Sequence, residues 1–167
     1  MRIRAYQEAD REGLKEITSA AFDGVSTDQN IERRYGRIRG HDWRWHKARH
    51  IDQDIAAHAA GIFVAELEGQ VVGYVTTRVN AEAGQGTIAH LAVLPEHHKK
   101  GIGRALIDAA LAHFREAGLD LVRIGTMEQN VVASRFYPRL GFREVAREIT
   151  YVLPLRDAQQ AGPAEET

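Results

Sequence analysis

Residues 91 to 104 read LAVLPEHHKKGIGR, and this stretch decides how the rest of the chain is interpreted. An apolar run ends at Pro95, a basic loop follows, and Gly101 and Gly103 flank one apolar residue where a helical pattern begins. Backbone N–H groups in the first turn of a helix have no partner and carry partial positive charge. Glycines at that point let an anion approach the backbone closely. The stretch predicts a strand, a phosphate-binding turn and a helix over about 101–117.

The side chains of this loop favour a phosphorylated ligand, because His98, Lys99, Lys100 and Arg104 add positive charge around the turn. The spacing excludes a nucleotide-triphosphate P-loop, since G-x-x-x-x-G-K-[ST] is absent, and Leu106 replaces the third glycine of a dinucleotide-binding fingerprint. A second interpretation stays open at this point. The glycines could merely shape a turn and the lysines could be solvated surface.

Outward from the turn, residue alternation and helical spacing predict a mixed α/β domain. Asp10 is expected to cap the first helix, and turn formers at 23–30 are expected to end it. Strands are predicted at 2–6, 61–67, 71–79, 87–94, 121–126 and 142–153, and helices after Asp10, on either side of residues 39–41, at 101–117 and at 130–140.

The stretch from Glu32 to His50 combines arginines with Trp43 and Trp45. One interpretation is a pocket for an acidic or phosphorylated acceptor; the other is a helix whose tryptophans pack on the sheet and whose arginines are solvated. His46 and His50 are four residues apart and could form a bidentate metal pair. No third ligand is evident, and we expect no metal.

Composition sets the outer limits of function. The chain has 167 residues, 22 basic against 23 acidic side chains and no cysteine. The near-neutral charge argues against a nucleic-acid-binding protein, and the missing cysteine excludes disulfides and cysteine nucleophiles. No apolar run suits a membrane span or a signal peptide, so we expect a cytoplasmic protein without membrane contact. We expect one domain over 1–153 and a disordered tail over 154–167.

A second motif lies about thirty residues further on, where residues 130–142 read NVVASRFYPRLGF. Together, V-x-P-x-x-H-x-x-G-x-G and N-x-x-A-x-x-F-Y-x-x-x-G-F resemble the GCN5-related N-acetyltransferase (GNAT) superfamily. The resemblance runs from about Gly61 to Phe142. It implies a mixed, mostly antiparallel central sheet flanked by helices and splayed at a cofactor cleft, with acetyl-CoA as co-substrate.

The resemblance also implies roles for single residues. Backbone groups of Leu91, Ala92 and Val93 would bind the pantetheine arm like an added strand. N–H groups from His98 to Arg104, a segment that includes Ile102, would hold the pyrophosphate. Asn130 would contact the pantetheine, and Ala133 and Phe136 would form its wall.

For the chemistry, the resemblance implies that Tyr137 protonates the leaving thiolate and that the Val93 N–H holds the oxyanion. The base is less clear, because the positions that carry Glu or His in several members are Thr87 and Ala89 here. Glu128 is our preferred base, and Glu82 and a water-relayed proton are alternatives. His90 should face the other way by strand alternation.

Two departures from the family pattern concern the loop, where His98 stands for the usual Gln or Arg and Lys99 for a frequent Gly. The backbone interaction survives both, although acyl-CoA preference or pH dependence could change. The sequence thus favours an N-acetyltransferase acting on a primary amine of a small molecule or a protein. The alternative is a CoA-binding sensor or interaction module with little catalysis. The last predicted strand offers an edge for a homodimer.

Overall fold

The computed structural model describes residues 1–155, and a five-stranded sheet in the order β1-β2-β3-β4-β5 forms its centre. Neighbouring strands are antiparallel from β1 to β4, and β5 is parallel to β4. The strands are β1 (Arg2–Ala5), β2 (Ile62–Leu67), β3 (Gln70–Asn80), β4 (Gln85–Val93) and β5 (Leu121–Ile124). The predicted mixed, mostly antiparallel sheet is confirmed.

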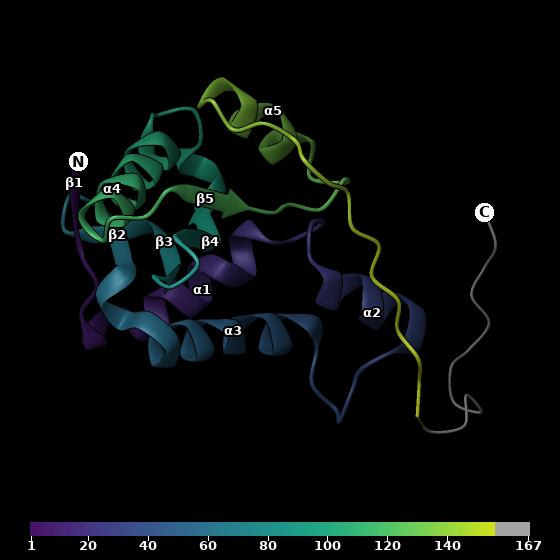
Figure 1. Cartoon of the computed structure of the whole chain (residues 1–167). Helices are drawn as coiled ribbons and strands as arrows, with labels where there is room; N and C mark the ends of the chain where they lie inside the picture. Colours follow the sequence, from purple (N-terminus) through teal and green to yellow (C-terminus); the bar gives the residue numbers. More distant parts are fainter. Residues whose placement is uncertain (156–167) are drawn as a thin grey trace.

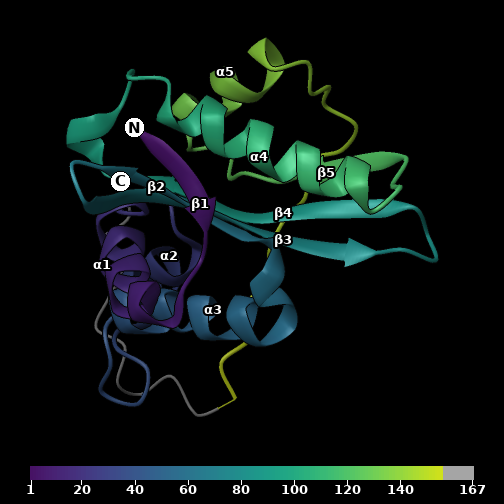
Figure 2. The ribbon, with the colours of Figure 1, turned by 90° about the vertical axis from the view of Figure 1, so that its left-hand side faces the viewer.

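Helices cover both faces of the sheet, as Figures 1 and 2 show. Helices α1, α2 and α3 lie on one face, and α4 and α5 lie on the other (Figure 2). Their bounds are α1 (Arg11–Ala21), α2 (Thr27–Tyr35), α3 (Trp43–His58), α4 (Ile102–Glu116) and α5 (Val131–Arg139). Three short 3₁₀ turns add Glu8–Asp10, Ala59–Gly61 and Pro95–His97.

Each face of the sheet has its own apolar core. On the α4 face the core combines strand residues with one stripe of the helix: Ala65, Val72, Val75, Ile88, Ile102, Leu106, Ile107, Ala110 and Phe114. On the opposite face Tyr74 and Ala92 pack with Leu14, Ile17 and Ile51, and the Tyr74 hydroxyl lies 2.7 Å from Thr18 Oγ1. Burying one large apolar side chain contributes roughly 1.5–3 kcal/mol, so α4 is held firmly over the sheet.

One glycine fixes how closely α4 approaches β4. A Cβ on Gly86 would lie 2.6 Å from the Phe114 ring, too close for any side chain. The Phe114 ring, near the end of α4, therefore rests on bare backbone at the start of β4. Helix α4 thus runs antiparallel to β4.

Most predicted elements are confirmed, with shifts at the ends. The hairpin of β2 and β3, the strands β1 and β4, and α4 match the expected ranges closely. The predicted turn over 23–30 is too long, because α2 already begins at Thr27. Asp10 precedes α1 but makes no side-chain capping bond there; it accepts hydrogen bonds from Arg4 and from the Gln7 N–H instead.

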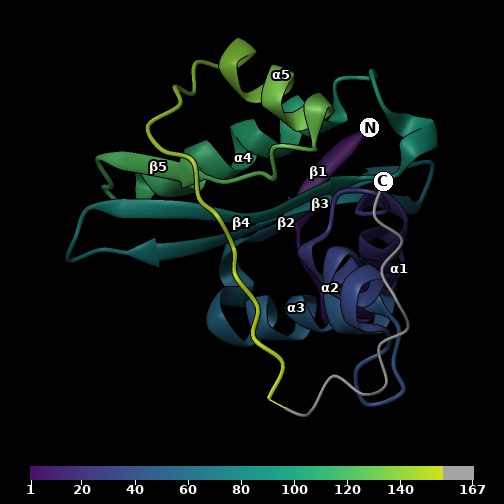
Figure 3. The same ribbon diagram turned by 90° about the vertical axis from the view of Figure 1, so that its right-hand side faces the viewer.

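The predicted strand over 142–153 is wrong for this structure. Residues 142–154 are not paired with any strand of the described chain, and they run from α5 along the outside of the molecule past the sheet (Figure 3). The Tyr35 hydroxyl donates to the Val152 carbonyl at 3.4 Å, which ties the segment to α2. A strand needs a partner as well as an alternating sequence, and sequence alternation does not reveal whether one is available.

Among residues 1–155, no helix combines the length and the apolar character needed to cross a bilayer. The same residues contain no group of three or more His, Asp or Glu side chains arranged to hold a metal ion. The expected tail over 154–167 lies outside the described residues from position 156 onward.

Candidate functional site

The parallel pairing of β4 with β5 stops halfway along β4. Register partners run from Gln85 and Leu121 to Ile88 and Ile124, and β4 continues to Val93. On the side away from β3, residues 89–93, called the unpaired edge below, therefore have no strand beside them in the described chain. An extended ligand with amide groups could take the place of the missing strand.

The register with β3 decides which backbone groups face the unpaired edge. The Leu94 N–H donates to the Val72 carbonyl at 2.9 Å, and Ala92 pairs with Tyr74. Because hydrogen-bonded and non-bonded positions alternate in an antiparallel ladder, Leu91 and Val93 turn their N–H and C=O groups away from β3. Of the three residues predicted to bind pantetheine, these two direct backbone groups to the unpaired edge, where His98 already contacts the Val93 carbonyl, while the Ala92 side chain is buried.

The unpaired edge leads directly to the start of α4. Gly101 adopts a left-handed φ of +81°, and the first helical bond runs from the Ala105 N–H to the Gly101 carbonyl at 3.1 Å. The N–H groups of Ile102, Gly103 and Arg104 therefore have no partner within the helix. Three N–H groups at a positive helix end fit a phosphate, so the turn suits the pyrophosphate of CoA.

Side chains of α5 and of the basic loop lie around this turn. A Cβ on Gly103 would lie 3.4 Å from Phe136 Cζ, so the aromatic ring of α5 rests against the turn. His98 Nε2 lies 2.9 Å from the Val93 carbonyl, and Lys100 Nζ lies 3.3 Å from His97 Nδ1. His98 thus contacts the end of the unpaired edge itself, and Lys99 and Lys100 remain exposed beside it.

Helix α5 brings the second motif to the same place. Asn130 caps the helix by accepting a hydrogen bond from the Ala133 N–H at 3.1 Å. Tyr137 packs between Phe136 and Phe142, and burial raises the pKa of its phenol to about 12. A phenol with this pKa keeps its proton at neutral pH, as an acid that awaits a thiolate must.

The predicted base Glu128 lies on the loop between β5 and α5. Its carboxylate is 87% exposed and lies 3.0 Å from Arg147 Nη1. The neighbouring Gln129 donates to the Gly24 carbonyl at 2.6 Å and accepts from Asn30 at 3.0 Å, so this loop is attached to the α1–α2 connection and to α2 itself. Glu82 is exposed on the β3–β4 turn, at the end of β4 opposite Val93.

Sequence reasoning missed a buried polar array under β4. His90 Nδ1 lies 2.6 Å from Asp54 Oδ2, and His90 Nε2 lies 3.1 Å from Lys47 Nζ. Thr76 and Arg78 of β3 also donate to the Asp54 carboxylate, at 2.7 and 2.8 Å. Burial alone would raise the pKa of Asp54, but the bond from His90 and the other contacts hold it at about 2.

The expectation that His90 faces away from the acceptor-side positions is wrong, and a β-bulge is the reason. Thr76 pairs with His90 and Thr77 pairs with Ile88, so Ala89 is an extra residue in β4. The extra residue shifts the alternation, and His90 turns to the α3 face. Thr87 pairs with Arg78, which reaches the same carboxylate, so Thr87 and His90 share that face.

Two further titratable groups extend this array toward α2. The His50 ring lies 5.6 Å from the His90 ring, and His50 Nε2 lies 3.8 Å from Asp28 Oδ2. Burial lowers the pKa of Lys47, and burial together with the charge of Lys47 lowers the pKa of His50. The array thus connects β4 to a carboxylate on α2.

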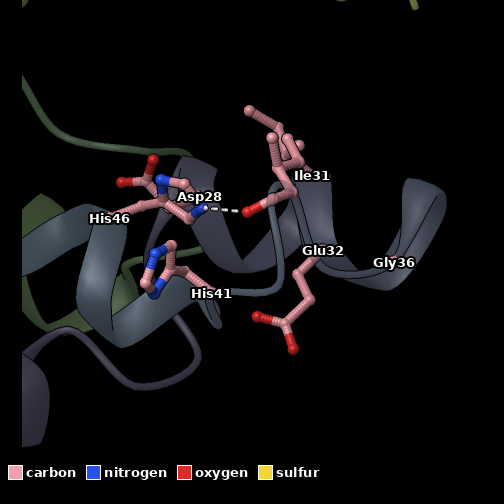
Figure 4. A pocket seen from close by; sticks show the side chains of 7 residues that line it. Asp28, Ile31, Glu32, Gly36, His41 and His46 are labelled. Atoms are coloured by element: carbon pink, nitrogen blue, oxygen red, sulfur yellow. Dashed lines mark hydrogen bonds between the residues drawn. The ribbon is translucent and has the colours of Figure 1, made fainter. Parts of the chain in front are cut away.

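Asp28 also lines a hollow of about 60 Å³ between α2 and the start of α3 (Figure 4). The other lining residues are Ile31, Glu32, Gly36, Ile38, His41 and His46, and His46 Nε2 contacts the Ile38 carbonyl at 3.2 Å. Two carboxylates in this lining suit a cationic amine better than an acidic acceptor.

The two tryptophans of the basic stretch lie in different surroundings, and Trp43 lines a shallow hollow together with Gln29, Glu32 and Arg33. Trp43 is buried, with Arg44 over its ring at 4.6 Å. Trp45 stacks on His41 at 3.7 Å, with Arg49 at 4.7 Å. The burial of Trp43 fits the packing interpretation only in part, because Trp43 belongs to neither core of the sheet, and the arginine contacts are made to aromatic rings of the same stretch.

Comparison with known proteins gives consistent results. The model of the family described as "Acetyltransferase (GNAT) family" matches residues 24–142. A mycothiol acetyltransferase of Thermobispora bispora is 41% identical over 97 residues, which cover 55% of this chain and 33% of that protein. One of Propionibacterium freudenreichii is 29% identical over 179 residues, covering 99% and 52%. The chain thus spans between a third and about half the length of these relatives.

Among solved structures, a PaiA N-acetyltransferase from Thermoplasma acidophilum in complex with coenzyme A superimposes with a TM-score of 0.71. It is 20% identical in sequence, and the match covers 88% of this chain and 92% of that one. At this identity the likeness concerns the fold, which the two chains share across most of their length.

Proposed function

The chain belongs to the acetyltransferase (GNAT) family, and we propose that it transfers the acetyl group of acetyl-CoA to a primary amine by direct attack in a ternary complex. The observation that carries this proposal is the unpaired edge of β4 leading into the open N-terminus of α4. Strand-like backbone groups and a phosphate-binding turn follow each other within about ten residues, as an extended ligand with a pyrophosphate at one end requires.

In this proposal the backbone groups of Leu91 and Val93 bind the amides of the pantetheine arm. The pyrophosphate lies on the N–H groups of the loop and helix start, with the charges of His98, Lys99, Lys100 and Arg104 around it. Ala133 and Phe136 of α5 form the wall, and Asn130 fixes the start of that helix.

The chemical steps need one acid, one oxyanion donor and one base. The amine nitrogen attacks the thioester carbon, a backbone N–H of the unpaired edge stabilises the oxyanion, and the C–S bond breaks. Tyr137 gives its phenolic proton to the sulfur. Glu128 would have to break its ion pair with Arg147 to take the proton of the amine.

We propose that the amine enters from the α2–α3 side, where Asp28 and Glu32 line the hollow. The carboxylates would attract a cationic acceptor, which loses its proton before it attacks. The curated relatives are named mycothiol acetyltransferases, and this supports an acetyl acceptor of low molecular weight.

We further propose a homodimer formed by strand exchange at β5. Apolar side chains of the segment after α5 alternate along the chain and face solvent: Val145, Ile149, Tyr151 and Leu153 are 76–95% exposed. In residues 1–155 the outer edge of β5 has no partner strand either. Each copy thus offers both a free edge and an unpaired strand-forming segment, and Tyr35 holds that segment near its own α2. In a dimer, the segment after α5 of each copy can pair with the β5 edge of the other copy, so both exposed edges are covered.

Thiol release from acetyl-CoA tests the transfer reaction. Purified protein is mixed with acetyl-CoA and a panel of spermidine, benzylamine, glucosamine and alanine amide, and free CoA is measured over time. Amine-dependent release supports an enzyme. Tight acetyl-CoA binding without any release above the amine-free rate would favour the sensor alternative.

A further inference from the structure

The buried array under β4 lies where the proposed reaction would take place. Pairing between β4 and β5 ends at Ile88, and the bulge at Ala89 follows immediately. With the pyrophosphate at α4, beyond the Val93 end, an extended CoA would run along the unpaired edge with its thioester toward the bulge. His90 is the first residue after that bulge, so its side chain lies beside the expected position of the acyl carbon.

The face on which His90 lies is opposite the face that carries the expected wall of the cofactor. Helices α4 and α5 cover the opposite face of the sheet (Figure 2), and α5 carries the residues expected to wall the cofactor. His90 turns to the α1–α3 face, where the hollow lined by Asp28 is also found. An amine that enters from this side meets the array before it meets the thioester.

Hydrogen bonding determines which nitrogen of the array can accept another proton. The Asp54 carboxylate can only accept, so His90 Nδ1 carries the hydrogen at the 2.6 Å contact. In the neutral ring, His90 Nε2 then holds the lone pair, and Lys47 Nζ donates to it across 3.1 Å. When Lys47 is neutral, the lone pair of Lys47 Nζ is the only one along the Asp54–His90–Lys47 contacts that can accept a further proton.

The surroundings favour a lysine that changes its protonation. Lys47 is only 9% exposed, and burial lowers its pKa, partly offset by Asp28 and Asp54. Around the array, α1 contributes the Phe22 ring at 4.3 Å from Nζ, α2 contributes Asp28, α3 contributes His50 and Asp54, and β3 contributes Thr76 and Arg78. Buried lysines readily lose their proton and then act as bases.

We propose that Lys47 is the proton acceptor of the acetyl-transfer reaction, with His90 and Asp54 as positioning residues. As the amine nitrogen bonds to the acyl carbon, its proton passes to Lys47 Nζ, and the C–S electrons go to sulfur, which takes a proton from Tyr137. The ammonium formed at Lys47 donates to His90 Nε2 and is stabilised by the Asp54 charge through the ring. Solvent then carries the proton from Lys47 back to Tyr137.

This inference rests on the proposed function and is tested with four readouts on the full chain: acetyl-CoA affinity by calorimetry, kcat and kcat/KM with the most active amine of the panel, and melting temperature. Lys47→Met should lower kcat by about 10²- to 10³-fold with an unchanged acetyl-CoA Kd. His90→Gln should have a smaller effect of the same kind. Lys15→Met and His58→Gln are matched controls, because Lys15 pairs with Glu12 and Asp52 and His58 contacts His113, and none of these residues belongs to the array.

The pH profile separates positioning from a structural role. Removing the Asp54 charge makes the ammonium less favourable, so Asp54→Asn should move the acidic limb of kcat/KM to lower pH. Asp52→Asn, on the same helix but paired with Arg11, should leave the limb in place. A folded Lys47→Met with wild-type kcat, or an unmoved limb in Asp54→Asn, overturns the inference. If the wild-type protein does not bind acetyl-CoA, or shows no turnover with any amine, the proposed function itself is overturned.

Discussion

His90 and Asp54 are 36 residues apart in sequence, and a 2.6 Å contact between Nδ1 and Oδ2 joins them under the sheet. This contact fastens the bulge of β4 to the C-terminal third of α3. It also fixes the imidazole tautomer, because the carboxylate accepts the Nδ1 hydrogen. The place where β4 separates from β5 is thereby held by the Asp54 carboxylate, whose side chain is 1% exposed.

The acid role of Tyr137 predicts a loss confined to turnover. Tyr137→Phe keeps the ring between Phe136 and Phe142 but removes the proton that the thiolate needs. We expect kcat to fall by about 10²-fold, with acetyl-CoA affinity within twofold of the wild type. Steady-state kinetics and calorimetry on the same preparation check this. Weak binding combined with normal kcat would contradict the acid role.

The phosphate-binding turn predicts that one carboxylate abolishes CoA binding. In Gly103→Glu the new Cβ would meet Phe136 Cζ at 3.4 Å, an ordinary contact, so the helix should persist. The added charge would repel the pyrophosphate at the helix start, and we expect at least a hundredfold weaker acetyl-CoA binding. Gly13→Glu is the control, since a Cβ there meets nothing within 4 Å. Equal affinity in both variants would show that the turn does not hold phosphate.

Stability should fall in acid because Asp54 holds its charge in the folded state. Its pKa drops from an ordinary 3.8 to about 2, which at about 1.4 kcal/mol per unit amounts to about 2.5 kcal/mol. A depressed carboxylate pKa stabilises the fold above the unfolded value and loses that contribution as pH falls through the folded value. Urea unfolding should therefore show a difference between wild type and Asp54→Asn at pH 5 that shrinks between about pH 4 and pH 2. A difference in unfolding free energy that stays constant between pH 5 and pH 2 would contradict a stabilising charge on Asp54.

Strand exchange at β5 predicts a dimer that depends on the apolar row after α5. Light scattering coupled to size exclusion should give twice the chain mass of 18.6 kDa. Ile149→Asp places a charge in the apolar row and should produce a monomer. Thr150→Asp adds the same charge at the next residue, on the alternate side of the extended chain, and should remain dimeric. A monomeric wild type at micromolar concentration would contradict the exchange.

Local signals explain why the turn before α4 and the start of α5 were predictable. Gly101, Gly103 and Asn130 act within a few residues of their own positions, through backbone conformation and capping. The hairpin of β2 and β3 follows from alternation and a short turn in the same way. Such features depend little on the rest of the chain.

The proton-accepting array could not be predicted, because it depends on register and on contacts between distant elements. The bulge at Ala89 appears only when β3 and β4 are aligned, and it reverses the side on which His90 lies. In the sequence, Lys47 and Asp54 are ordinary charged residues of a helix. Only the packing of α3 under the bulge buries them and brings them to His90. The strand predicted over 142–153 was wrong for the opposite reason. Its sequence alternates as a strand does, but the described chain offers it no partner strand.

Calorimetric titration of acetyl-CoA into the purified protein tests the central claim most directly, with desulfo-CoA and ATP titrated under the same conditions. We predict saturable micromolar binding of acetyl-CoA and desulfo-CoA with one site per chain, and no binding of ATP, which lacks the pantetheine arm that the unpaired edge of β4 would hold. Absence of binding by both CoA compounds would contradict the account, because the unpaired edge and the turn at α4 would then only shape the fold.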